Sequence, residues 1–255
     1  MIKIKNFNKL VFEKTKPFYI FKIENFLDNN LYEKIRLNFP ENPNDCTDYN
    51  NLKFGFSNSS DHYKNIIKTN NYLREFHDLV YSKEFFEFFY NSLFTKILIA
   101  RKNNFLHLLK ILRPSKFLKD QEENINFFKK IFYNKIKIGI SFSYIKNGGF
   151  IVPHTDSISK LISLMIYFPD TELLEESELG TNFYHHRISN YQNKHLEDKN
   201  FDKFYQKAEL TYKSNFDRNN LYGFIKSKYS WHSVSRINFG NKNYFRKSIN
   251  INFYF

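Results

Sequence analysis

A strict two-residue alternation constrains the fold of this chain more than any other feature. Apolar side chains occupy every second position of one stretch, namely Ile136, Ile138, Ile140, Phe142 and Tyr144. Successive side chains of a β-strand point to opposite faces of its sheet, so this period predicts a strand with one buried face. The chain is therefore expected to contain a long strand near its middle.

A series of shorter strands is predicted after the turn formed by Asn147, Gly148 and Gly149. These strands span residues 150–154, 161–168, 180–183, 221–225, 231–234 and 245–255. Successive short strands separated by turn signals are typical of a β-sandwich or a β-barrel. Residues 188–220 are polar and lack a clear period, so we interpret them as an insertion or a lid outside the barrel.

The first part of the chain, up to about residue 133, has mainly helical patterns. Asp28 and Ser82 are suitable N-caps, and apolar residues follow each of them at helical spacing. A short strand is expected at Phe18–Ile23, and the polar stretch Glu41–Asp61 is expected to be a loop. We therefore predict one α+β domain (1–255), in which a helical part (1–133) supports a mainly β core (134–255).

Charge and composition restrict the partners and the compartment. A formal net charge of +13 favours acidic partners such as nucleic acids, but the lysines are scattered, which is typical of a solvated surface. The single cysteine, Cys46, excludes an intramolecular disulfide and fits a reducing compartment. Residues 1–14 lack the apolar core of a signal peptide, and no apolar run approaches the ~20 residues of a membrane span. We expect a cytoplasmic protein that does not enter the membrane.

Two histidines and an aspartate stand in a pattern that suits a metal centre. His154 and Asp156 form a His-x-Asp motif at the end of a predicted strand, and His232 lies near the start of the final strands. Two histidines and one carboxylate are the facial triad of non-haem iron(II) oxygenases, which leaves coordination positions open for other ligands. His-x-Asp alone is common, so the specificity comes from the turn before it, the strand after it and the distal histidine.

At these residues the chain resembles a known family. Residues 144–168, YIKNGGFIVPHTDSISKLISLMIYF, resemble the iron-binding core of prolyl 4-hydroxylase-like iron(II)- and 2-oxoglutarate-dependent oxygenases. Residues 231–255 resemble the matching C-terminal part, residues 180–184 the strand between them, and residues 17–35 the usual beginning of the domain. The resemblance implies a double-stranded β-helix of the jelly-roll or cupin-like type, with helices packed behind one sheet. It also implies Fe(II) bound by His154, Asp156 and His232, with 2-oxoglutarate as co-substrate.

The family binds the far carboxylate of 2-oxoglutarate with a basic residue after the distal histidine. Arg236, Arg246 and Lys247 are the candidates. Strand alternation puts Arg246 and Ser248 on the polar face of the last strand, whereas Lys247 shares its face with isoleucines and a phenylalanine. The planar guanidinium also suits a carboxylate. We therefore predict that Arg246 binds 2-oxoglutarate with help from Ser248. The interval from His232 to Arg246 is somewhat longer than is usual in the family.

Other polar residues near the motif allow two interpretations each. Tyr144 either approaches the 2-oxoglutarate pocket, as a tyrosine often does in the family, or belongs to the core. Lys160 either reaches an acidic ligand or lies at a strand edge, and Trp231 either supports packing or stacks on the substrate. His185 and His186 are adjacent, so on a strand they face opposite ways and do not share one metal, although one of them could line the pocket. The remaining histidines, His62, His77, His107 and His195, have no partners at ligand spacing.

The resemblance implies a dioxygenase that uses dioxygen to hydroxylate a C–H bond, with release of succinate and carbon dioxide. Its substrate would be a small molecule, a sugar, or a peptidyl or free amino acid. Two other classes stay open: a catalytically inactive binding module of the same fold, and a nucleic-acid demethylase. The module would lack iron-dependent turnover of 2-oxoglutarate. The demethylase would need a basic groove with stacking aromatic residues beside the iron.

Overall fold

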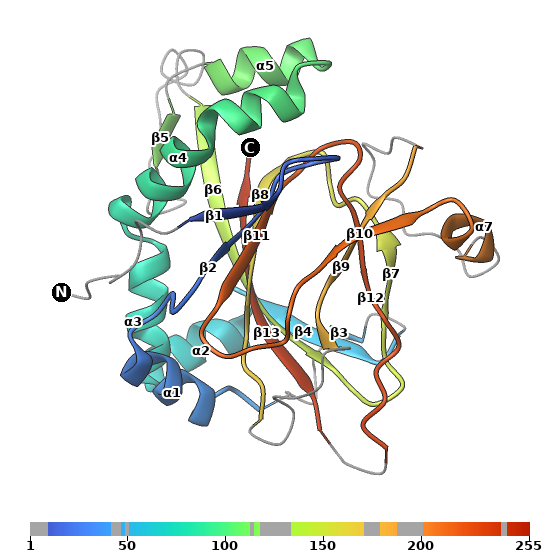
Figure 1. Cartoon of the computed structure of the whole chain (residues 1–255). Coiled ribbons are helices and arrows are strands. Elements are labelled where there is room, and N and C mark those ends of the chain that lie inside the picture. The colour runs from blue at the N-terminus through green and yellow to red at the C-terminus, as the bar shows by residue number, and fades with distance from the viewer. Residues whose placement is uncertain are drawn as a thin grey trace.

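The structure is a computed structural model, and it describes residues 10–41, 47–48, 51–112, 115–117, 134–170, 179–187, 201–240 and 244–255. Two β-sheets face each other, and most of the helices lie on the outer side of the larger sheet (Figure 1). The helices therefore cover the outer face of the larger sheet, and its inner face borders the space between the two sheets.

The larger sheet has nine strands, of which eight follow one path. In spatial order these are β1 (Val11–Lys14), β2 (Ile20–Ile23), β11 (Leu221–Ile225), β8 (Lys160–Tyr167), β13 (Arg246–Tyr254), β6 (Asn134–Ile145), β4 (Lys53–Ser57) and β3 (Thr47–Asp48). The ninth strand, β5 (Ser115–Phe117), pairs with β6 in parallel. The strand pairs along the main path are antiparallel.

The smaller sheet has four strands, in the spatial order β10 (Glu209–Lys213), β9 (Asn182–His185), β12 (Trp231–Val234) and β7 (Ile151–His154). From β6 onwards the described strands alternate between the two sheets, except that the consecutive strands β9 and β10 belong to the same sheet. This winding, with β6-β13-β8-β11 opposite β7-β12-β9-β10, is that of an eight-stranded jelly roll, or double-stranded β-helix. The predicted fold class is confirmed.

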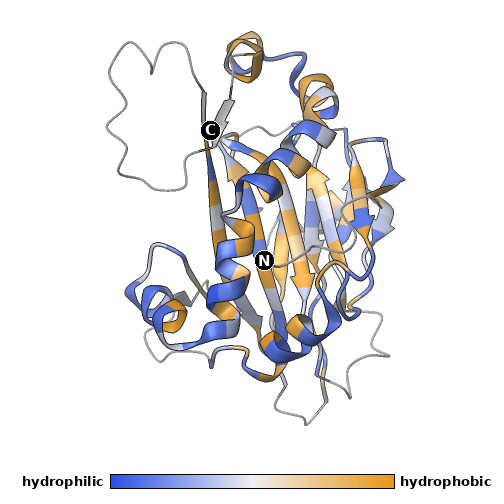
Figure 2. Cartoon of the chain, turned by 90° about the vertical axis from the view of Figure 1, so that its left-hand side faces the viewer, coloured by the Kyte–Doolittle hydropathy of each residue, from blue (hydrophilic) through white to orange (hydrophobic). Residues whose placement is uncertain are grey.

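The helices are α1 (Asn29–Leu37), α2 (Asp61–Thr69), α3 (Asn71–Val80), α4 (Lys83–Arg101), α5 (Phe105–Leu112) and the short α7 (Phe201–Tyr205). Asp28 caps α1 and Ser82 caps α4, as predicted. Aromatic rings of α4 pack against the larger sheet. The ring centres of Phe89 and of Phe253 in β13 are 6.1 Å apart. Figure 2 shows helices in front of the strands of the larger sheet, viewed from the side opposite α7. This packing leaves the other face of the large sheet to line the space between the sheets.

The expected loop at Glu41–Asp61 is wrong in part, because Lys53–Ser57 forms β4 and pairs with β6. Phe54 and Phe56 face the helical core, whereas the alternate positions are polar or glycine. A strand with so short an apolar pattern is hard to recognise, because only one of its faces is buried against a partner layer. Residues 42–46 and 49–50 of the predicted loop lie outside the described residues.

The predicted insertion at 188–220 is also wrong in part, because Glu209–Lys213 forms β10 of the smaller sheet. This strand lies at the sheet edge and is exposed or half-buried, and its register shifts between Leu210 and Tyr212. A bulge of this kind disrupts the two-residue period by which a strand is recognised. Residues 188–200 of the predicted insertion fall outside the described part of the chain.

Within the described ranges, no helix combines the length and the apolar character that crossing a bilayer requires.

Candidate metal centre

Two neighbouring strands of the smaller sheet bring the predicted triad together. His154 ends β7 and lies directly opposite His232 of β12, and their rings are 4.1 Å apart. Pro153 is tolerated beside His154 because β7 is an edge strand. Two residues later Asp156 has φ 62, a left-handed conformation that aspartate adopts more readily than most residues. The structure thus places the three side chains at one end of the space between the sheets.

The ligand atoms of the triad lie within 4.8 Å of one another, and all three residues are buried. Nε2 of His154 is 3.8 Å from Oδ1 of Asp156, and Nε2 of His232 is 3.7 Å from Oδ2. Among the described residues, no other group of histidine, cysteine, aspartate and glutamate side chains has the proximity that a metal ion needs. One ion placed between these atoms would be bound by all three side chains.

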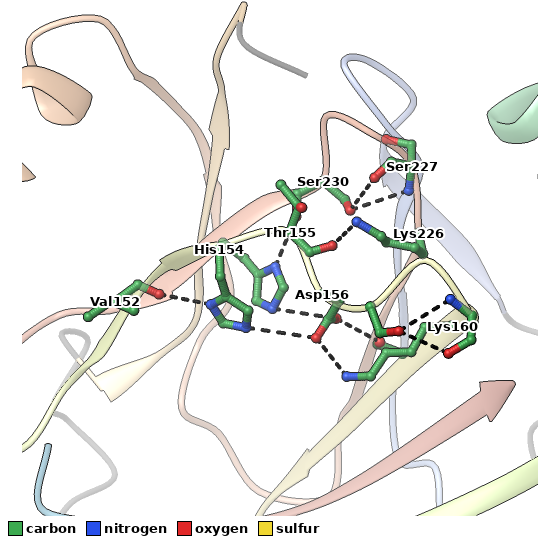
Figure 3. A network of polar contacts seen from close by, with 12 residues as sticks. Val152, His154, Thr155, Asp156, Lys160, Lys226, Ser227 and Ser230 are labelled. Atoms are coloured by element: carbon green, nitrogen blue, oxygen red, sulfur yellow. Dashed lines mark hydrogen bonds and ion pairs between the residues drawn. The ribbon is translucent and has the colours of Figure 1, made fainter. Parts of the chain in front are cut away.

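Backbone carbonyls fix the orientation of both imidazoles (Figure 3). Nδ1 of His154 donates to the carbonyl of Val152 at 2.8 Å, and Nδ1 of His232 donates to that of Ser230 at 2.9 Å. A carbonyl oxygen only accepts, so each Nδ1 carries the proton and each Nε2 keeps its lone pair for the shared space. Both histidines are therefore in the tautomer that a metal ligand requires.

The charges of the triad also fit a divalent ion. Burial alone would raise the pKa of Asp156, but the charge of Lys160 holds this pKa well below its usual range. Burial lowers the pKa of His232, and the Asp156 carboxylate opposes that effect. Two neutral imidazoles and one carboxylate with open positions beside them are the donor set of non-haem iron(II) centres. The residues present therefore fit iron(II).

Two lysines support the loop that carries Asp156. Nζ of Lys160 donates to Oδ1 of Asp156 at 2.6 Å, and the hydroxyl of Ser163 donates to Oδ2 at 3.3 Å. Although burial alone would lower the pKa of Lys160, the Asp156 carboxylate raises it. Buried Lys226 donates to the carbonyl of Thr155, and burial lowers its pKa to about 7. Lys160 is the first residue of β8, and its partner in the structure is Asp156, so contact of Lys160 with an acidic ligand stays a prediction.

We expect Lys160→Met to destabilise the metal-free protein by ~3–5 kcal/mol, because it leaves the buried Asp156 carboxylate without its cation. Bound metal should restore most of this loss, since the ion replaces the missing charge. Urea unfolding with and without Ni(II) measures both effects. The control is Lys247→Met, which breaks a half-buried pair with Asp170 away from the triad. A loss that is the same in the presence and absence of metal would contradict this account.

The last strand points its side chains as the alternation predicts. Arg246, Ser248, Asn250 and Asn252 line the cavity beside the triad. On the opposite face Lys247 pairs with Asp170, and Ile249 lies in the helical core. Arg236, the third basic candidate, is a surface residue that donates to the carbonyl of Gly148. Arg246 is thus the candidate whose side chain reaches the cavity.

Buried Arg246 is held by neutral groups. Its Nε donates to the carbonyl of Leu179 at 2.5 Å and its Nη2 to the hydroxyl of Thr181 at 3.2 Å. The guanidinium carbon lies 4.9 Å from the ring centre of Tyr167 and 5.7 Å from that of Phe216. Burial lowers the pKa of this guanidinium. Among the residues that the structure describes, no carboxylate pairs with Arg246, so the site suits an anionic ligand.

Several other predicted positions lie away from the cavity. Tyr144 does not reach it: β6 points this side chain toward the helices, where its hydroxyl donates to the carbonyl of Pro40 at 2.7 Å. The alternation that makes β6 recognisable also puts Tyr144 with the core positions rather than with Ser143. Trp231 is buried against Phe204 and supports packing. His185 is exposed, and His186 stacks on Phe204.

The sequence analysis missed several residues of the cavity. The Thr181 hydroxyl accepts a hydrogen bond from Arg246. The Tyr167 hydroxyl lies 2.8 Å from the Thr181 hydroxyl and 2.8 Å from the Ser214 hydroxyl. Tyr167 lies in a continuous apolar run, so no periodic signal shows that its hydroxyl lies beside Thr181. Lys53 belongs to the unrecognised strand β4. The alternation on β6 indicated the face that Ser141 and Ser143 share, but not that this face lines a cavity.

Fold and site together define a double-stranded β-helix protein with a His-x-Asp and distal His triad. No family model matches the sequence, and no curated protein matches it. Several solved protein structures are similar in fold to this chain. A prolyl-4-hydroxylase from Pseudomonas putida is 11% identical, with 93% of each chain covered and a TM-score of 0.40.

Two further similar structures were solved with ligands. HygX from Streptomyces hygroscopicus, with nickel, 2-oxoglutarate and hygromycin B bound, is 8% identical over 92% of this chain and 82% of its own (TM-score 0.44). The other is a prolyl hydroxylase from Trichoplax adhaerens in complex with a peptide fragment of the hypoxia inducible factor oxygen degradation domain. It is 10% identical over 92% of this chain and 83% of its own (TM-score 0.45). These likenesses are distant, so the fold assignment rests on the strand order and pairing described above.

Proposed function

We propose that this chain is an iron(II)- and 2-oxoglutarate-dependent dioxygenase that hydroxylates a C–H bond, with release of succinate and carbon dioxide. The observation that carries the proposal is one cavity lined by both the triad and Arg246. The triad alone would fit several metals and reactions. A buried guanidinium in the same cavity adds a site for the carboxylate of a 2-oxo acid that also reaches the metal.

Each residue has a defined part in this proposal. His154 and His232 bind the metal through Nε2, and Asp156 binds it through its carboxylate. Bound iron(II) with 2-oxoglutarate and dioxygen would supply the oxidising power for C–H hydroxylation. Arg246 binds the far carboxylate of 2-oxoglutarate, and Ser248 and Thr181 provide hydroxyl donors beside it. The Tyr167 and Phe216 rings keep the guanidinium in place and exclude water from the ion pair.

The test is 2-oxoglutarate consumption without added substrate. We expect purified protein with Fe(II) and dioxygen to convert 2-oxoglutarate slowly to succinate, as measured by NMR of both acids. His154→Ala should not do so. Iron binding without any succinate, even after addition of broad panels of metabolites and peptides, would favour the inactive binding module. Failure to bind iron at all would remove the proposal.

A further inference from the structure

The turn between β11 and β12 supports two of the three metal ligands. It consists of residues 226–230, which follow the end of β11 and precede β12. The carbonyl of Ser230 accepts the hydrogen bond of Nδ1 of His232, and Lys226 extends to the loop that carries Asp156 (Figure 3). One short segment therefore acts on ligands that come from two different parts of the chain.

Lys226 acts on the peptide unit that precedes Asp156. Its Nζ donates to the carbonyl of Thr155, and both residues are fully buried. This peptide unit is planar, so a donor that fixes the direction of its carbonyl also restricts φ of Asp156. That angle is 62°, a left-handed value that is uncommon for residues other than glycine and persists where the surroundings hold it. The hydrogen bond of Lys226 thus stabilises the backbone that directs the Asp156 carboxylate toward the two histidines.

Lys226 is held in place by its own neighbours. Its backbone N–H donates to the carbonyl of Leu161 in β8 at 3.0 Å. The hydroxyl of Ser230 donates to the carbonyl of Ser227 at 2.9 Å and accepts from the N–H of Ser227 at 3.3 Å, which closes the turn. A buried amine is costly without a hydrogen bond, so Nζ of Lys226 has little freedom to leave the Thr155 carbonyl.

The charge of Lys226 and its hydrogen bond affect metal binding in opposite directions. Burial is the largest cause that lowers the pKa of His232, and the charges of Lys160 and Lys226 lower it further. An ammonium group this close to the triad also repels a divalent ion. Removing the charge alone would therefore strengthen metal binding, whereas removing the support of the Asp156 backbone would weaken it.

We infer that Lys226 is a positioning residue for the metal centre, which acts through the Thr155 carbonyl to keep the Asp156 carboxylate directed at the ion. Together with the Ser230 carbonyl, this contact makes the turn a common support for two ligands, so that their separation is fixed before an ion binds. The inference rests on the metal centre of the proposed function, and it does not depend on the hydroxylation reaction.

Titration of metal-free protein with Co(II) by isothermal calorimetry tests the inference. Lys226→Met retains the length of the side chain and removes its donor and its charge. We expect this variant to bind Co(II) about 10–100-fold more weakly, which is the usual effect of losing a group that supports a metal ligand. The matched control is Lys22→Met in β2, because Lys22 has 14% of its side chain exposed and pairs with Glu24 and Asp217, away from the triad. It should bind Co(II) as the wild type does.

The visible absorption spectrum of bound Co(II) gives a second measurement, because it depends on the arrangement of the ligands. At saturating Co(II) we expect Lys226→Met to have a changed spectrum and Lys22→Met to have that of the wild type. A variant that is only less stable would regain the wild-type spectrum when saturated. Ser230→Ala retains the carbonyl but loses both hydroxyl bonds to Ser227, so it should weaken binding in the same direction.

Three results would overturn the inference: Co(II) binding by Lys226→Met that equals or exceeds that of the wild type, weaker binding with an unchanged spectrum, or an equal loss in Lys22→Met. If Lys226→Met does not fold, Ser230→Ala decides, and wild-type affinity in that variant would overturn the inference. Failure of the proposed function is separate, because it would be seen in the wild type as bound metal without succinate. A wild type that binds no metal would overturn both.

Discussion

Asp156→Ala is expected to weaken iron(II) binding by more than about 100-fold and to abolish turnover of 2-oxoglutarate. Loss of a residue that only supports a ligand costs about 10–100-fold in metal affinity, so loss of the anionic ligand itself should cost more. His154→Ala should have a similar effect, because its Nε2 faces the same space as Oδ1 of Asp156. Equilibrium dialysis with Fe(II) under anaerobic conditions measures the affinity, and succinate formation measures the turnover.

The variant must be separated from one that simply misfolds. Asp156→Ala leaves Lys160 buried beside the two histidines, so Asp156→Asn, which keeps the size of the side chain, is made in parallel. Asp170→Ala is the matched control, because it also removes an aspartate that pairs with a lysine, Lys247, but lies away from the triad. Circular dichroism shows whether each variant is folded. Folded Asp156→Ala protein with wild-type iron affinity and turnover would refute the metal assignment.

The triad could be predicted from sequence because local patterns determine its parts. His154 follows a recognisable turn and ends a strand, and Asp156 comes two residues later in a loop. The alternation of β13 separated Arg246 from Lys247, because a strand buried on one face by isoleucines must turn the alternate side chains to the other face. In both cases residues close in sequence carry enough information to orient a side chain.

The parts that were not predicted depend on contacts between distant segments. Strands β4 and β10 lie at or near sheet edges, where one-sided or irregular burial weakens the apolar period. Lys53 reaches the cavity only because β4 pairs with β6, and no local pattern shows that pairing. Thr181 reaches Arg246 only through the fold, since 65 positions separate them. For Tyr144 the alternation favoured the core position, and resemblance alone suggested the pocket.

Arg246→Ala is expected to raise the apparent Michaelis constant for 2-oxoglutarate at least tenfold while iron affinity stays nearly unchanged. Removing one partner of a buried, hydrogen-bonded charge pair costs ~2–5 kcal/mol, and each 1.4 kcal/mol is about tenfold in affinity. Iron affinity should be spared because the contacts of Arg246 are with Leu179, Thr181 and aromatic rings and not with the triad. Titration of 2-oxoglutarate against succinate formation measures the first effect, and anaerobic Fe(II) dialysis the second.

The other two basic candidates, Lys247 and Arg236, provide the controls for this prediction. Lys247→Ala breaks only the pair with Asp170 on the opposite face of β13, and Arg236→Ala removes a surface contact with the carbonyl of Gly148. Both should bind 2-oxoglutarate as the wild type does. If either shows the large loss and Arg246→Ala does not, the carboxylate of 2-oxoglutarate is bound outside the Thr181 and Tyr167 network. If Arg246→Ala instead loses iron affinity as well, Arg246 supports the fold of the cavity, because a residue that only binds the carboxylate would leave the metal ligands unchanged.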